Sequence, residues 1–351
     1  MFSLKKFGIA SFSHLLGTTT LLMFLSLVGT SAFAQFAGPV PLALVNGWTG
    51  APFSTSLPTV EEVAGIVQFR GSIAGGTTGT AFTLPVGLRP ATSVYIPVDL
   101  CNATNGRLII QSTGVVIVQA ETSFSNAQCF TSLDGASFAP TTSGFTALTL
   151  INGWNNAPFG TSNVEVKKIS GIVHFKGAMA TGGTNSVPFI LPPAYRPKTE
   201  VYVPVDLCNA TNGRLHITTA GVVDVEVETS FSNAQCFTSL DGAWFSTAGG
   251  TLHPINGWFG APFSTNLPKA ANAYGVIHFM GAIATGGTNS LAFSLPIALR
   301  PVTDVYIPVD LCNATKGRML VRSNGDVFVQ AEGNFANAQC FTSLDGASFV
   351  Q

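Results

Sequence analysis

The sequence predicts an all-β protein made of three tandem antiparallel β-sandwich domains, jelly-roll-like and about 100 residues each. The first observation is an internal repeat, because the string NAQCFTSLDGA occurs three times, starting at Asn126, Asn233 and Asn337. The second is hydrophobic alternation with a period of two, which is typical of strands with one buried face. The third observation is that no window of about a dozen residues has the periodicity of a helix. We therefore expect domains over residues 42–139, 147–246 and 252–351.

Residues 1–34 have the features of a cleaved signal peptide. Two lysines are followed by a largely apolar run over residues 15–29, and Ala-Phe-Ala before Gln35 offers the small residues of a cleavage site. A membrane anchor is the alternative, but about 20 apolar residues are needed to span a bilayer, and threonines interrupt this run. No later segment is long and apolar enough. We expect a secreted or cell-surface protein, with the periplasm as the alternative location.

Charged residues are scarce, at 9% of the chain. Cleavage of residues 1–34 would remove two of the 16 basic residues and none of the 17 acidic ones. The net charge of the mature chain is therefore negative and does not attract nucleic acid. The hydrophobic content of 46%, with 27 phenylalanines, predicts a folded core rather than disorder.

The predicted strands follow one order in every copy. In GIVQFRGSI, Val67 and Phe69 share the face expected in the core. In SVYIPV, Pro97 predicts an edge strand or a bulge. Residues 106–121 predict two strands around a turn in which Gly114 takes a positive φ. The Trp48 side chain, repeated as Trp154 and Trp258, is expected to be a packed anchor at the start of each domain.

The cysteines predict one disulfide within each copy. Two cysteines recur in every copy at the same separation, and a domain that folds alone should close its own bridge. Such bridges form in oxidising compartments, in agreement with an export signal. Zinc is the alternative, but the spacing lacks the paired cysteines of zinc sites. The predicted pairs are Cys101 with Cys129, Cys208 with Cys236, and Cys312 with Cys340.

These motifs together resemble a known family. The order GGT, FTLP, LRP and YIPV, followed by a GRL hairpin and a closing SLDGASF, resembles the small C-terminal β-sandwich domains of bacteriophage tail fibres and related phage-derived proteins. The resemblance implies a sandwich used at fibre tips, commonly trimeric, that meets cell-surface carbohydrate. The export signal, the cysteine pair and the tandem fusion depart from it and favour a cell-secreted protein. The matching positions in the first copy are Asn46, Gly47, Trp48, Gly65, Gly71, Leu84, Pro85, Arg89, Pro90, Gly106 and Asp134.

The fusion of three copies leaves two arrangements open. If single-copy relatives associate as trimers, three fused copies form one pseudo-trimer within the chain. The alternative is an extended string of domains, since linkers of this length permit either.

The predicted ligand-binding residues lie on the strand face that points away from the predicted core, where the copies differ. Alternation also sets Trp244 outward from Phe245, where a tryptophan stacks on a sugar ring or seals a domain interface. The predicted residues are Gln68, Arg70, His174, Lys176, Trp244 and His278.

The copies argue against an enzyme, because no histidine is shared by all three. Shared carboxylates leave a glycosidase or an esterase as a distant alternative, which would be tested by changing Glu121, Glu228 and Glu332 together. No cofactor and no metal are predicted. We expect a protein that binds a surface glycan or an extracellular matrix component, or mediates adhesion. The alternative is a structural component of an extracellular layer or appendage.

The string DLCNATNGR, from Asp99 to Arg107, is predicted to be a structural corner. We expect a strand to end at Val98, Cys101 to tie it to the closing strand, and Asn-Gly to turn the chain into the hairpin. The spacing of its oxygens departs from that of a calcium loop. Nearly the same string recurs from Asp206 and from Asp310. The sequons of the three copies, at Asn102, Asn209 and Asn313, are glycan acceptors in a host that glycosylates.

Overall fold

The computed structural model describes residues 38–351, which lie in one compact unit that spans Gln35–Gln351. The predicted signal peptide falls outside the described residues. The all-β prediction is confirmed, because the sheets are antiparallel and the α-helices have six residues each. No helix among residues 38–351 is long and apolar enough to cross a membrane.

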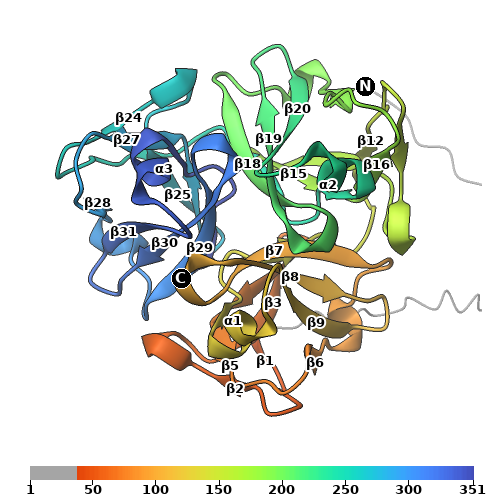
Figure 1. Ribbon diagram of the computed structural model, residues 1–351. Coiled ribbons are helices and arrows are strands. Elements are labelled where there is room, and N and C mark those ends of the chain that lie inside the picture. The colour runs from red at the N-terminus through yellow and green to blue at the C-terminus, as the bar shows by residue number, and fades with distance from the viewer. Residues whose placement is uncertain (1–37) are drawn as a thin grey trace, which may run out of the picture. The chain divides into compact units, whose positions relative to one another are not determined.

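Each repeat contains the same succession of eleven strands and one α-helix (Figure 1). The first repeat comprises β1 (Val40–Pro41), β2 (Thr49–Gly50), β3 (Thr59–Val63), β4 (Ile66–Arg70), β5 (Ser72–Ala74), β6 (Thr80–Thr83), β7 (Val94–Asp99), β8 (Asn105–Ile110), β9 (Val115–Ala120), α1 (Phe124–Cys129), β10 (Thr131–Ser132) and β11 (Ser137–Phe138). The second comprises β12 (Thr146–Ala147), β13 (Trp154–Asn156), β14 (Glu165–Ile169), β15 (Ile172–Lys176), β16 (Ala178–Thr181), β17 (Phe189–Ile190), β18 (Val201–Asp206), β19 (Asn212–Ile217), β20 (Val222–Val227), α2 (Phe231–Cys236), β21 (Thr238–Ser239) and β22 (Trp244–Ser246). The third comprises β23 (Gly250–Thr251), β24 (Trp258–Gly260), β25 (Lys269–Ala273), β26 (Val276–Met280), β27 (Ala282–Thr285), β28 (Leu291–Ser294), β29 (Val305–Asp310), β30 (Lys316–Val321), β31 (Asp326–Ala331), α3 (Phe335–Cys340), β32 (Thr342–Ser343) and β33 (Ser348–Val350).

Two four-stranded sheets enclose the core of each repeat. In the first repeat their strand orders are β1-β3-β4-β11 and β6-β9-β8-β7, and β7 is the edge strand that Pro97 predicted. Val67 and Phe69 point inward, as alternation predicted, and pack with Phe82 and Leu108 of the other sheet in one buried cluster. Such a layer removes apolar area from water, which stabilises the fold by roughly 25 cal/mol for each Å².

A bend at Gly71 divides β4 from β5. This glycine has a φ of +88°, and a Cβ atom there would lie 2.5 Å from the Ser56 carbonyl oxygen, so a larger residue does not fit. Its N–H donates to the Asp134 carboxylate at 2.9 Å, which ties the bend to the Leu-Asp-Gly turn. The Trp48 side chain is the predicted anchor, with 4% of its surface exposed and its Nε1–H donating to the Thr78 carbonyl at 2.9 Å.

The three predicted disulfides are present, but the corner around each differs from the prediction. Cys101 bonds to Cys129 at the end of helix α1 rather than to a closing strand. The chain turns at residues 100–104, and Asn105 already belongs to β8, paired with Asp99 of β7. The predicted Asn-Gly turn was therefore wrong. The six-residue helices were missed because fewer than two helical turns are too short to show periodicity.

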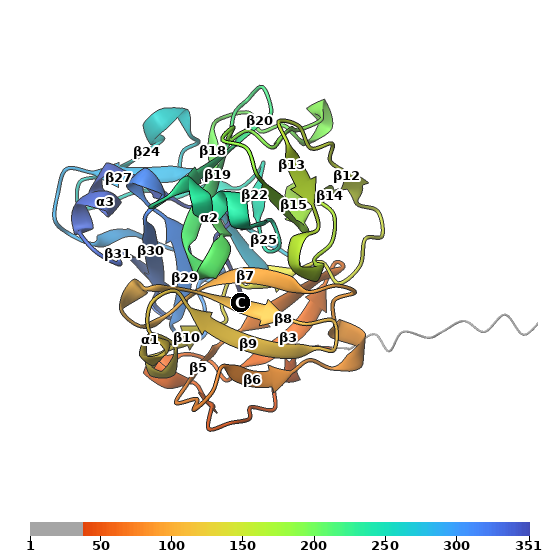
Figure 2. The ribbon, with the colours of Figure 1, turned by 45° about the vertical axis from the view of Figure 1, so that its right-hand side comes forward.

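The repeats contact one another in a closed ring rather than along a string. β7, β18 and β29 each contact the other two, and the three repeats surround a common centre (Figures 1 and 2). Serine hydroxyls donate across every boundary: Ser132 to the Tyr306 carbonyl and Ser239 to the Tyr95 carbonyl, both at 2.6 Å, and Ser343 to the Tyr202 carbonyl at 2.5 Å. The first strand of each repeat begins one or two residues before the predicted boundary, at Val40, Thr146 and Gly250.

Candidate functional site

The strand face that was predicted to be exposed is buried where the repeats meet. Gln68, His174 and His278 lie at equivalent positions of β4, β15 and β26, with exposed fractions of 5%, 6% and 4%. Lys176 is buried as well, and Arg70 is half-buried. The prediction of an open binding face was wrong because alternation identifies two faces of a strand but not what covers the second.

Trp244 points away from the core of its own repeat, as alternation predicted, but it is buried between repeats and is not exposed to a ligand. It lies opposite His174 in the register of β15 and β22. Its ring packs edge-on against the His278 ring of the next repeat, with centroids 4.6 Å apart. The tryptophan therefore seals an interface between repeats. We call this region the central layer, formed by Gln68, Ser137, His174, Trp244, His278 and Ser348.

The central layer has no room for an organic ligand. The cavity beside it holds about 20 Å³, which suits a single water molecule. Burial lowers the pKa of His174 to about 3 and the pKa of His278 to about 4, so both imidazoles are neutral at physiological pH. No group of three histidine, cysteine, aspartate or glutamate residues in the described part of the chain is arranged to hold a metal ion.

The repeated string that starts at Asp99 forms contacts between repeats. Arg107 donates to the Asp206 carboxylate of the second repeat at 2.9 Å, and the Asn105 amide donates to the Ala210 carbonyl at 2.6 Å. The third copy closes the ring, because Lys316 and Arg318 both reach Asp99, at 3.2 and 3.0 Å. The arginine and aspartate positions shared by all three copies were the signal for these ion pairs in the sequence.

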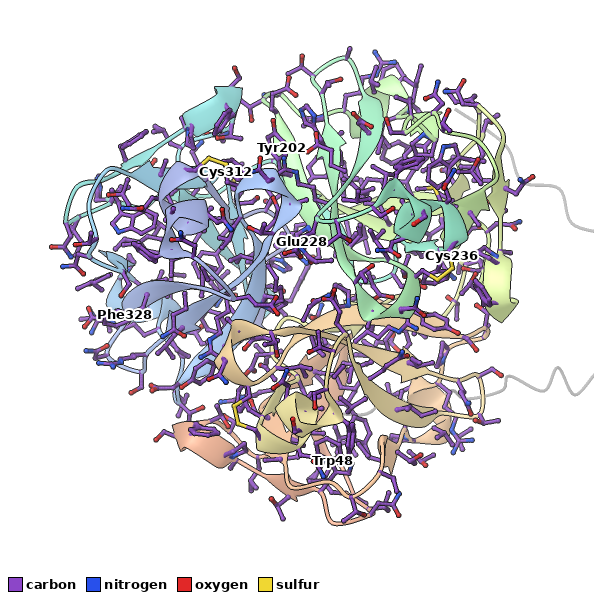
Figure 3. All side chains as sticks on the ribbon, in the orientation of Figure 1. Trp48, Tyr202, Glu228, Cys236, Cys312 and Phe328 are labelled. Atoms are coloured by element: carbon purple, nitrogen blue, oxygen red, sulfur yellow. A yellow bond between two sulfur atoms is a disulfide. The ribbon has the colours of Figure 1, made fainter. Side chains whose placement is uncertain are left out.

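Aromatic pockets open at two boundaries between repeats, beside these corners, and the third boundary carries the same aromatic side chains. We name the three sites by their tyrosines: the Tyr95, Tyr202 and Tyr306 pockets. Two of them each hold about 110 Å³, several times the volume of the cavity beside the central layer. The Tyr306 pocket is lined by Phe53, Cys101, Asn102, Phe130, Tyr306 and Arg318, and the Tyr202 pocket by Phe263, Cys312, Asn313, Phe341, Tyr202 and Arg214. In Figure 3, Tyr202 of the second repeat lies beside Cys312 of the third.

The Tyr95 pocket has the same aromatic arrangement. The ring centroids of Phe159 and Tyr95 lie 5.7 and 4.8 Å from that of Phe237, and the Arg107 guanidinium lies 5.0 Å from the Tyr95 centroid. The corresponding guanidinium distances are 4.8 Å at Tyr202 and 4.9 Å at Tyr306. The chain therefore builds one constellation three times.

One phenylalanine in each pocket is both exposed and held on a strained backbone. Phe53, Phe159 and Phe263 have exposed fractions of 59%, 64% and 59% and φ values of +53°, +54° and +51°. A bulky residue in the left-handed region costs on the order of 1–3 kcal/mol, and such outliers cluster at ligand sites. Sequence reasoning missed these residues. The available signal was the Ala-Pro-Phe string, kept in a loop of all three copies.

Polar groups border the aromatic rings. Asn102, Asn209 and Asn313 are exposed, each on left-handed backbone. Among the described residues, neither the Asn102 side-chain amide nor the Tyr306 hydroxyl has a hydrogen-bond partner. The pockets thus combine apolar ring faces with hydrogen-bonding groups open to a ligand. Glycosylation of the three sequons stays a prediction.

Three glutamates, one from each repeat, interact near the centre. Burial and the neighbouring charges of Glu332 and Glu228 raise the pKa of Glu121 to about 7, and burial with Glu332 does the same for Glu228. Figure 3 places Glu228 where the repeats converge. These side chains are not among those that line the aromatic pockets.

No family model matches the chain, and neither a curated protein nor a solved structure shows significant similarity to it. The resemblance to tail-fibre domains therefore stays a prediction from the sequence.

Proposed function

We propose that this protein binds carbohydrate through its three aromatic pockets, without turnover. The observation that carries the proposal is the exposed phenylalanine on strained backbone, present at every repeat boundary. Pyranose rings present apolar C–H faces that pack on aromatic side chains, while their hydroxyls take hydrogen bonds. Each pocket offers both, through its phenylalanines and its asparagine, tyrosine and arginine.

Three pockets in one chain suit a multivalent surface ligand. Linked sites engage a repeated glycan with an avidity that exceeds the affinity of one site. The three disulfides fit an extracellular protein, and the predicted signal peptide leads us to propose secretion or display on the cell surface. The proposal also agrees with the threefold, carbohydrate-binding role that the resemblance to tail-fibre domains implies.

A structural component of an extracellular layer is the second candidate. It is favoured by exposed apolar side chains outside the pockets, since Val86 and Ile297 have exposed fractions of 78% and 80%. Self-association through such side chains would assemble the chain into sheets or filaments.

A glycan array separates the two candidates. The residues 35–351 should bind one or more glycans, and the variant Phe53→Ala/Phe159→Ala/Phe263→Ala should lose that binding while it stays folded. The control is Val86→Ala/Ile297→Ala, which removes exposed apolar side chains outside the pockets and should bind normally. Absence of glycan binding, together with self-assembly that the control variant abolishes, would favour the structural candidate.

A further inference from the structure

The pockets share one constellation, but the sheet face beside the Tyr202 pocket differs from its two counterparts. This face belongs to β18, β19 and β20, and it contains Tyr202 and Arg214 themselves. Across the strands, Tyr202 pairs with His216, His216 with Asp224, and Arg214 with Glu226. Side chains opposite one another in an antiparallel sheet share a face, so these groups form one surface with the pocket wall.

Three charged residues occur on this face only in the second repeat, and a fourth position is acidic both there and in the third repeat. Glu200, His216, Asp224 and Glu226 are replaced in the first repeat by Ser93, Ile109, Ile117 and Gln119, and in the third by Asp304, Leu320, Phe328 and Gln330. At these positions the first repeat has no charge and the third has one carboxylate, whereas the second has three carboxylates and forms an acidic face.

The acidic groups are coupled directly to the pocket wall. His216 stacks on the Tyr202 ring with centroids 4.4 Å apart and an interplanar angle of 5°. Its Nε2 lies 2.8 Å from Glu200 Oε2, and its Nδ1 lies 3.3 Å from Glu226 Oε1. Hydrogen bonds to these carboxylates raise the pKa of His216, with Glu226 contributing most.

The positive charge of the arginine in this pocket is paired with two carboxylates. Arg214 pairs with Asp310 at 2.8 Å, and its Nε donates to Glu226 at 2.7 Å. In the other pockets the second partner is a neutral amide, because Arg107 donates to Gln119 at 3.1 Å and Arg318 to Gln330 at 2.6 Å.

A negative charge therefore remains at the Tyr202 pocket. Four carboxylates, from Glu200, Asp224, Glu226 and Asp310, face two cationic side chains, Arg214 and His216. Asp224 Oδ1 is buried and has no hydrogen-bond partner among the described residues. An unsatisfied buried acceptor on the acidic face favours a ligand that donates.

We propose that the Tyr202 pocket selects a glycan that carries a protonated amine, such as an unacetylated amino sugar, whereas the Tyr95 and Tyr306 pockets take neutral glycans. The inference rests on the proposed function and assigns the ligand class of one of its three sites. The sugar packs on Phe263 and Tyr202, and its ammonium group is bound by the carboxylates of the acidic face. Hydrogen bonds of this kind are stronger than those between neutral groups.

Pockets isolated by substitution test this inference. Phe53→Ala/Phe159→Ala leaves the Tyr202 pocket intact, and Phe159→Ala/Phe263→Ala leaves the Tyr306 pocket intact. Titration calorimetry with a glucosamine oligosaccharide at neutral pH should give binding about tenfold tighter at the first than at the second, as one charge-assisted hydrogen bond would produce. Its N-acetylated form should not show this preference.

The chain itself offers the matched change. Glu226→Gln installs the residue present at positions 119 and 330, so it should fold normally and should lower amine binding at the Tyr202 pocket about tenfold. Glu200→Ser, the residue at position 93, should act in the same direction. Binding of the N-acetylated oligosaccharide that depends on Phe263, with no preference for the amine or with a preference that survives both variants, would overturn this inference alone. Failure of every pocket to bind either oligosaccharide would overturn the proposed function with it.

Discussion

The repeats meet in two regions that behave in opposite ways. At the pockets, the aromatic rings and the arginine are identical in all three copies, and part of their surface is open to solvent. In the central layer the equivalent residues differ, with Gln68, His174 and His278 on one set of strands, and all of them are buried. The variation in the central layer therefore lies where no ligand reaches, whereas the aromatic walls of the pockets are identical in all three copies.

The difference follows from geometry. Each pocket is surrounded by its own pair of repeats, so the same residues serve three times. The central layer is one space shared by three copies, and a single chain can fill it unequally: Trp244 occupies the volume, while Ser137 and Ser348 leave room for it. In the central layer, the differences between the repeats therefore reflect packing and not ligand specificity.

The largest expected effect separates the two regions by stability. Trp244→Ser installs the residue found at positions 137 and 348, and the cavity it leaves should lower the free energy of unfolding by about 3–5 kcal/mol. Phe159→Ala removes an exposed ring and should change it by less than about 0.5 kcal/mol. Urea unfolding measures both variants. A similar loss in Phe159→Ala would show that the pocket phenylalanines hold the fold instead of serving a ligand.

A smaller effect is expected at the ion pairs that join one repeat to the next. Arg107→Ala leaves the fully buried Asp206 without its cation and should lower the free energy of unfolding by about 3 kcal/mol. Lys316→Asn is the control, because Asp99 keeps Arg318 and asparagine already occupies positions 105 and 212. It should cost less than about 1 kcal/mol. Equal losses, compared by urea unfolding, would contradict the assignment of the ring's stability to the arginines.

The sequence predicted what depends on one repeat, left the arrangement of the three repeats open, and missed the sites between them. The disulfides, the Trp48 anchor and the core face of β4 follow from spacing and alternation inside one copy. The burial of Trp244 required knowing that β26 lies beside β22, a contact that no local pattern encodes. The pockets were missed for the same reason, since Phe53 and Tyr306 are separated by most of the chain.

The role of the repeated string was predicted only in part, because it too depends on contacts between repeats. Its cysteine gave the corner, but Asn-Gly was interpreted as a turn because those residues favour turns in isolation. In the structure Asn105 donates across the boundary to Ala210, so its role belongs to the ring rather than to the hairpin.

The smallest expected effect, on the order of 1 kcal/mol for each pH unit and each group, distinguishes the central layer from the shared Leu-Asp-Gly turns by titration. Burial raises the pKa of Asp134, in the segment shared by all copies, from 3.8 to about 7, and its Oδ2 has no partner among the described residues. The folded state then binds more protons than the unfolded state between those values, so stability falls as pH rises through them. Asp241 and Asp345 behave alike.

The central layer should act with the opposite sign. His174 and His278 have folded pKa values below the ordinary 6.5, so the unfolded state binds more protons and stability falls as pH drops from 6.5 towards 4. His174→Gln/His278→Gln, which repeats Gln68, removes this term. It should steepen the loss of stability with rising pH between about pH 4 and 6.5, whereas Asp134→Asn should make that loss shallower. Urea unfolding across this range measures both slopes, with the exposed Glu62→Gln as a control. If both variants shifted the slope in one direction, the central layer and the Leu-Asp-Gly turns would not be electrostatically distinct.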